Sequence, residues 1–165
     1  RTLTPADAEA LADFKTRVDN YVKIHQQAEG ALPRLPKETT LEVVDRHQRS
    51  LEKLMRAGRA GAKPGDLLTP PVQRLVRQVL ARVFSGKAGQ EMKATILDEN
   101  PGPMPLAING RYPDEVPLST VPPQVLSALP KLPEELEYRF VGERLVLLDV
   151  HAHTIADYMN DAFPR

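Results

Sequence analysis

The four histidines are the residues of this chain whose types and spacing best suit chemistry, and they fall into two groups. The first group has His25 on the apolar face of one predicted helix, with Glu29 one turn later, and His47 on the apolar face of the next. If these helices form an antiparallel hairpin, the two imidazoles lie at similar heights. His25, Glu29 and His47 are therefore a candidate site for zinc or another transition metal, which binds imidazole and carboxylate ligands.

The second group lies near the end of the chain, where Asp149, His151 and His153 alternate along one short segment. Alternate residues of a strand point to the same face, so a strand here would present all three side chains together. Asp149 or Asp157 would supply the carboxylate of this second candidate metal site. The residues from Thr154 onward also fit a helix, and we favour a strand to about residue 151 followed by a short helix.

The segment Asp149-Val150-His151-Ala152-His153 resembles the His-x-His strand of the amidohydrolase superfamily. The resemblance implies a (β/α)8 barrel with further metal ligands downstream of the motif. A chain of 165 residues is short for such a barrel, and few residues follow the motif. We therefore treat the two histidines as an isolated candidate site and assign no family.

A basic stripe is the third feature that could carry function. It lies on the face of the second predicted helix opposite the apolar one and consists of Arg46, Arg49, Lys53 and Arg56. Such a stripe suits phosphates or an acidic protein. The net charge of zero and the absence of Trp disfavour nucleic acid, which usually needs aromatic stacking platforms. We expect contact with another protein, and keep nucleic-acid binding as a further alternative.

Motifs of the common enzyme classes are missing from the sequence. It contains no Cys, no serine in a nucleophile motif and no phosphate-binding glycine loop. The leading hypothesis is thus a non-enzymatic binding or accessory protein without a cofactor, which contacts a partner protein through proline-rich loops and the basic stripe. The alternative is a metal-binding protein or metal-dependent enzyme that uses one of the two histidine groups.

The location of the protein follows from weaker signals. No apolar run is long enough to span a bilayer, so we expect no membrane span. A first residue other than Met, together with zero Cys, favours an extracytoplasmic location, periplasmic or secreted, over the cytoplasm. The sequence indicates no particular small-molecule ligand.

Apolar periodicity and capping residues predict the elements that must position these groups. Helices are expected over about residues 5–29, 40–57, 70–85, 88–97 and 122–129. A hairpin is expected around the Gly142-Glu143 turn, and a shorter one around Asn109-Gly110.

Together these elements predict a single α+β domain over residues 1–165. Its helical part spans about residues 1–99, and its proline-rich and β part spans about residues 100–165. We expect about four N-terminal helices to pack on a small antiparallel sheet formed by the C-terminal half, followed by the short C-terminal helix. At this length the chain can bury a substantial apolar core.

Overall fold

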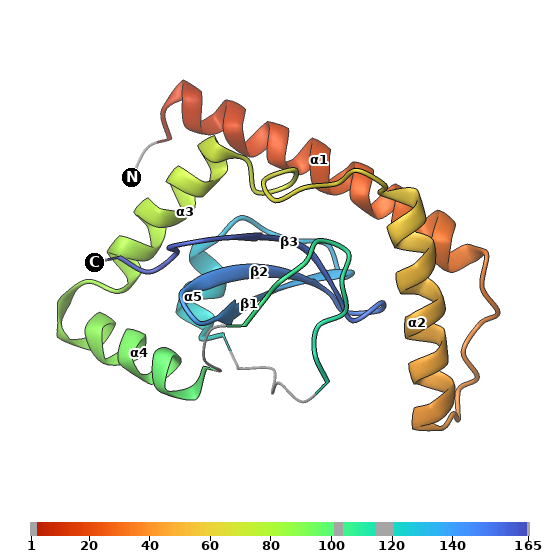
Figure 1. Cartoon of the computed structure of the whole chain (residues 1–165). Coiled ribbons are helices and arrows are strands. Elements are labelled where there is room, and N and C mark those ends of the chain that lie inside the picture. Colours follow the sequence, from red (N-terminus) through yellow and green to blue (C-terminus); the bar gives the residue numbers. More distant parts are fainter. Residues whose placement is uncertain (1–2, 101–103, 115–120, 165) are drawn as a thin grey trace.

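The computed structural model describes residues 3–100, 104–114 and 121–164, within which it has five helices and three strands (Figure 1). The helices are α1 (Pro5–Gly30), α2 (Leu41–Gly58), α3 (Pro70–Val83), α4 (Gly86–Glu99) and α5 (Pro123–Ala128). The strands are β1 (Leu136–Val141), β2 (Arg144–Asp149) and β3 (Thr154–Met159), in the antiparallel order β1-β2-β3. The α+β class is thus confirmed, with four long helices arranged in an arc around the sheet.

Helices α1 and α2 both begin at a capping residue and pack against each other. Helix α1 begins at a capping box, in which Thr4 and Asp7 each bond the backbone N–H of the other. Helix α2 begins after Thr40, whose hydroxyl accepts a hydrogen bond from the N–H of Val43. It returns past the C-terminal end of α1, where Gly58 lies against Ile24. The two helices cross at an oblique angle and do not form the antiparallel hairpin considered from the sequence (Figure 1).

The sheet buries a different apolar cluster on each face. One face packs against the helices through alternate residues such as Tyr138, Phe140 and Leu147. The other face carries Val146 and Leu148 under the segment of residues 104–112. The β1–β2 turn is at Gly142-Glu143 as expected, with Gly142 at a φ of 60°, a conformation that glycine adopts without strain.

The expected C-terminal helix is wrong, because Thr154–Met159 form the third strand. Without β3, the outer edge of β2 would leave a row of buried backbone groups without partners, which costs more than a weak helical preference gains. The strand is irregular, since the pairing shifts between Leu147 and Leu148. Three buried residues of β3, Thr154, Ala156 and Asp157, obscure its period in the sequence.

The shorter hairpin around Asn109-Gly110 is present only as a turn. Asn109 has a φ of 62°, but the residues before it form no strand, and a single bridge joins Arg111 to Thr154. Part of the proline-rich segment expected to dock partners, residues 101–103 and 115–120, lies outside the described residues. Within the described residues, no helix has the length and apolar character that crossing a bilayer requires.

Candidate metal centre

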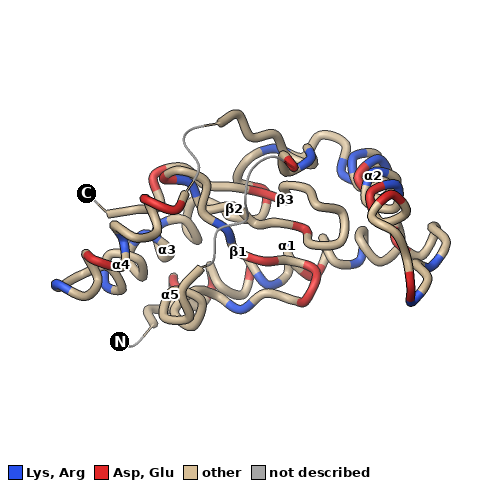
Figure 2. Tube along the Cα trace, turned by 90° about the horizontal axis from the view of Figure 1, so that it is seen from below, with Lys and Arg blue, Asp and Glu red and all other residues tan. Residues whose placement is uncertain are grey.

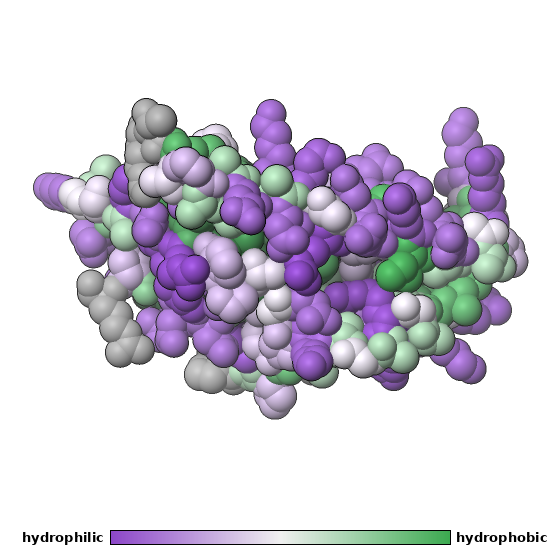
Figure 3. Space-filling model, turned by 90° about the horizontal axis from the view of Figure 1, so that it is seen from above, coloured by the Kyte–Doolittle hydropathy of each residue, from purple (hydrophilic) through white to green (hydrophobic). Residues whose placement is uncertain are grey.

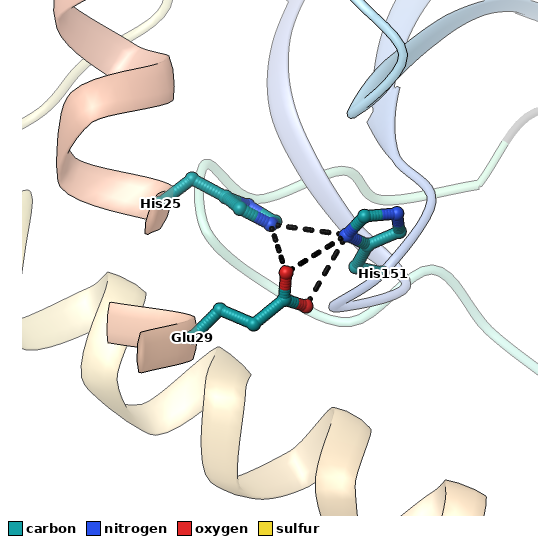
Figure 4. Close-up of side chains that lie close together, drawn as sticks. All are labelled: His25, Glu29 and His151. Carbon is teal, nitrogen blue, oxygen red and sulfur yellow. Dashed lines mark hydrogen bonds and ion pairs between the residues drawn. The ribbon is translucent and has the colours of Figure 1, made fainter. Parts of the chain in front are cut away.

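Three side chains from distant parts of the chain converge at one end of the sheet. His25 and Glu29 come from successive turns of α1, and His151 comes from the loop between β2 and β3 (Figure 4). His25 Nε2 lies 3.3 Å from His151 Nδ1 and 3.6 Å from Glu29 Oε1, and His151 Nδ1 lies 3.2 Å from Glu29 Oε1. Within the described residues, these three form a group whose ligand atoms all lie within 4.8 Å of one another.

The size of this triangle fits a transition metal ion. Zinc holds nitrogen and oxygen ligands at about 2.0–2.1 Å in a tetrahedron, so neighbouring ligand atoms stand roughly 3.3–3.4 Å apart. The observed separations of 3.2, 3.3 and 3.6 Å bracket that value. The three side chains therefore occupy positions suited to three corners of a tetrahedron, and the fourth corner is left for another ligand.

Asp149 fixes the orientation of the His25 ring. Its Oδ2 lies 2.6 Å from His25 Nδ1, and both side chains are fully buried. Because a carboxylate only accepts, the proton of the neutral ring lies on Nδ1, and the lone pair of Nε2 faces Glu29 and His151. A carboxylate behind the far nitrogen of a histidine is the usual outer partner in metal sites.

The same carboxylate shapes the loop that carries His151. Asp149 Oδ1 accepts hydrogen bonds from the backbone N–H of His151 at 3.0 Å and of Ala152 at 2.9 Å. This local pattern, in which an aspartate bonds the backbone two and three residues on, is a turn that Asp readily stabilises. One buried carboxylate thus positions two of the three candidate ligands.

Tyr21, on α1, bonds Asp149, and Arg59, at the end of α2, lies against Tyr21. The Tyr21 hydroxyl donates to Asp149 Oδ2 at 2.6 Å, and burial together with the Asp149 charge raises the pKa of Tyr21 well above its usual value. The Arg59 guanidinium lies 4.8 Å from the centre of the Tyr21 ring and donates to Asn109 Oδ1 at 2.7 Å. A buried polar chain therefore runs from Arg59 through Tyr21 and Asp149 to His25.

The surroundings of His25 also set its protonation. Burial acts to lower its pKa, but the hydrogen bond and charge of Asp149, with the charges of Glu29 and Glu135, outweigh burial and raise the pKa of His25 above 6.5. A proton on Nε2 occupies the lone pair that a metal would bind. Metal and proton would thus compete at this nitrogen.

The centre borders a pocket of about 650 Å³ between the end of α1, the connector of residues 31–40 and α2. Glu29 and His151, which are 34% and 37% exposed, form part of its wall, whereas His25 is fully buried behind them. His47 also faces this pocket, and its Nε2 lies 3.7 Å from Glu29 Oε2. His47 therefore lies near the second oxygen of Glu29.

The structure regroups the residues predicted from the sequence. His25 and Glu29 of the first set join His151 of the second, while Asp149 lies behind His25 and His47 lies beside Glu29. His153 and Asp157 do not join this group. Asp157 accepts hydrogen bonds from four backbone N–H groups, those of Gly65, Leu67, Leu68 and Tyr158.

The expectation that Asp149, His151 and His153 share one strand face is wrong. Residues 150–153 form a turn, and His153 has a φ of 57°, so its side chain leaves the backbone in another direction. It packs edge-on against Tyr112, with ring centres 5.7 Å apart. Burial and the charge of Arg111 lower the pKa of His153.

The basic stripe of α2 is exposed but partly paired within its own helix. Figure 2 shows acidic as well as basic residues along α2. Arg49 bonds Asp45 at 2.8 Å and Arg56 bonds Glu52 at 2.6 Å, while Arg46 and Lys53 lie on the same helix. The field that the stripe offers an acidic partner is reduced accordingly.

Tyr21 takes part in the site through its hydrogen bond to Asp149, a role that was not predicted from the sequence, although the sequence holds a signal for it. Tyr21, His25 and Glu29 follow one another at steps of four residues, so a polar row crosses the apolar face of α1. No local signal links that row to Asp149 and His151, which lie far away in the chain.

Comparisons with family models, with curated proteins and with solved structures find no match to this chain.

Proposed function

We propose that this protein binds a divalent transition metal ion, zinc in the first place, through His25 Nε2, Glu29 Oε1 and His151 Nδ1. The observation that carries the proposal is the triangle of these atoms, with sides of 3.2–3.6 Å, backed by the bond of 2.6 Å from Asp149 to His25. Three protein ligands and a free fourth position are typical of zinc sites that bind water or substrate.

Two matched variants of one loop test the proposal. His151→Ala removes a candidate ligand from a partly exposed position, so the fold should survive. His153→Asn changes a neighbouring histidine of the same loop that faces Tyr112, and Asn tolerates its positive φ. We expect untagged protein to take up one zinc per chain, and His151→Ala to weaken zinc binding far more than His153→Asn does.

The measurement is elemental analysis after dialysis, followed by competition with a coloured zinc chelator. Protein that takes up no zinc, cobalt, iron or copper would show that the three groups share only protons and hydrogen bonds. Equal losses in the two variants would place the ion elsewhere. Either result overturns the proposal.

Interaction with another protein through the basic stripe of α2 is a second proposal, which rests on the position of Arg46, Arg49, Lys53 and Arg56 on the outer side of that helix. It has less support than metal binding, because two of these cations already bond acids of the same helix. Exposed ion pairs of this kind contribute little energy and are screened by salt. An acidic partner would have to compete with them.

A further inference from the structure

The pocket beside the candidate metal centre has the size of a small-molecule site. Its volume of about 650 Å³ lies within the range of roughly 300–1,000 Å³ that is typical of such sites. Glu29 and His151 line it while His25 lies behind them, so an ion held by the three is reached from the pocket side. The fourth coordination position of that ion would therefore face the pocket.

The charges around the pocket favour an anion. Among the described residues that line it, Glu29 is the only acid and Arg34 is a base. A divalent ion adds two positive charges to this wall, which leaves the wall net positive. An incoming ligand with a negative oxygen would meet both the ion and the field of Arg34.

The remaining walls are largely apolar. Leu32 and Leu35 come from the connector, Val44 from α2 and Val150 from the loop that holds His151. Figure 3 shows that hydrophilic side chains cover most of the face seen from above and that hydrophobic ones form separate patches, one of them toward the end where α2 lies. Apolar walls beside an ion select a ligand with an apolar body and one charged end.

We infer that the pocket binds a small organic acid, with its carboxylate on the metal ion and its apolar body against Leu32, Leu35 and Val44. This inference rests on the proposed metal site. The carboxylate completes the tetrahedron, and Arg34, which also lines the pocket, adds attraction. Each methylene that enters the pocket leaves water, which strengthens binding.

Cobalt(II)-loaded protein provides the test, because the visible absorption of cobalt changes when a new ligand enters its coordination shell. The probes are acetate, butyrate and hexanoate, with hexanol as the neutral counterpart of hexanoate. We expect the acids to shift the spectrum and the dissociation constant to fall about fourfold per buried methylene. Hexanol should bind more weakly than hexanoate.

Three variants separate the pocket from the metal ligands. Arg34→Gln should weaken the binding of all three acids, and Val44→Glu should weaken hexanoate most by placing a like charge in the wall. Lys53→Gln, on the basic stripe of α2, is the control and should change nothing. None of the three changes a metal ligand, so the spectrum without acid should stay the same.

The outcomes distinguish the two proposals. Protein that takes up neither cobalt nor zinc overturns both. Protein that takes up cobalt but shows no spectral change with any acid overturns only the organic-acid site. That site is also overturned if acetate and hexanoate bind equally well, or if Arg34→Gln and Val44→Glu behave like Lys53→Gln.

Discussion

Two aspartates of the sheet, Asp149 at the end of β2 and Asp157 in β3, are both fully buried, yet they are satisfied by different partners. Asp157 takes its hydrogen bonds from backbone N–H groups, which hold the segment of residues 65–68 against β3. Asp149 divides its bonds between backbone N–H groups of its own loop and the side chains of Tyr21 and His25.

This difference gives Asp157 a structural role and Asp149 a role in what the candidate site can bind. The partners of Asp157 are backbone N–H groups, which do not titrate, and its hydrogen bonds to them hold two segments together. Asp149 acts on an imidazole whose other nitrogen faces a pocket-lining carboxylate, so its charge changes what that imidazole can bind. Burial of a charge is thus no guide to function until its partners are known.

A large effect on stability is expected from Asp157→Asn. Each carboxylate oxygen accepts two N–H groups, so the NH2 of Asn would face two donors and leave both unsatisfied. We expect the free energy of unfolding to fall by about 3 kcal/mol, measured by urea denaturation. Zinc affinity of the folded variant should hardly change, since Asp157 lies outside the group of candidate ligands.

The control for that variant is Asp13→Asn. Asp13 is 49% exposed and bonds Arg17 within α1, so its loss should cost less than about 0.5 kcal/mol. If Asp157→Asn were no more destabilising than Asp13→Asn, the four backbone bonds would not hold the fold as described.

The next effect is that of Asp149→Asn on metal binding. The substitution removes the charge behind His25 and, because Asp149 also accepts four hydrogen bonds, destabilises the fold much as Asp157→Asn does, so zinc binding is compared on folded protein. Loss of such an outer carboxylate typically costs about 10–100-fold in metal affinity. Competition with a zinc chelator measures the loss, with Asp157→Asn as the buried comparison. Equal zinc affinities in the two variants would contradict the division between the two aspartates.

Much of the fold was predictable because its signals are local. The β1–β2 hairpin follows from a glycine turn between two apolar runs, and α1 follows from its capping residues and periodicity. Strand β3 was not, because its place is set by the unpaired edge of β2, which is a tertiary demand. Its buried Asp157 also breaks the alternation by which a half-buried strand is recognised.

The candidate site was predictable residue by residue but not as a set. Spacing placed His25 and Glu29 on one helix face and singled out His151, since those signals lie within one element or one short motif. Which residues meet depends on how α1 packs across the end of the sheet, and no local pattern encodes that contact. Distance along the sequence therefore groups the histidines in two pairs and separates His151 from the residues that it approaches.

The smallest effect, and the one that best sharpens the comparison, is expected from Tyr21→Phe. The hydroxyl of Tyr21 donates to the same oxygen of Asp149 that holds His25 Nδ1. Loss of this bond should lower the free energy of unfolding by about 1.5 kcal/mol. It also leaves more of the Asp149 charge for His25, so the pKa of His25, already raised above 6.5, should rise further.

A metal binds only the deprotonated Nε2, so zinc affinity should be full above the pKa of His25 and should be lost as the pH falls through it. In the unmutated protein this loss should begin above pH 6.5, the ordinary value for histidine, because the pKa of His25 is raised. Tyr21→Phe should move the whole curve to higher pH while changing the affinity at alkaline pH little. Zinc titrations across a pH series check both curves. A shift to lower pH would mean that Tyr21 does not moderate the charge of Asp149, whereas a uniform loss at all pH values would mean that Tyr21 only holds the helix in place.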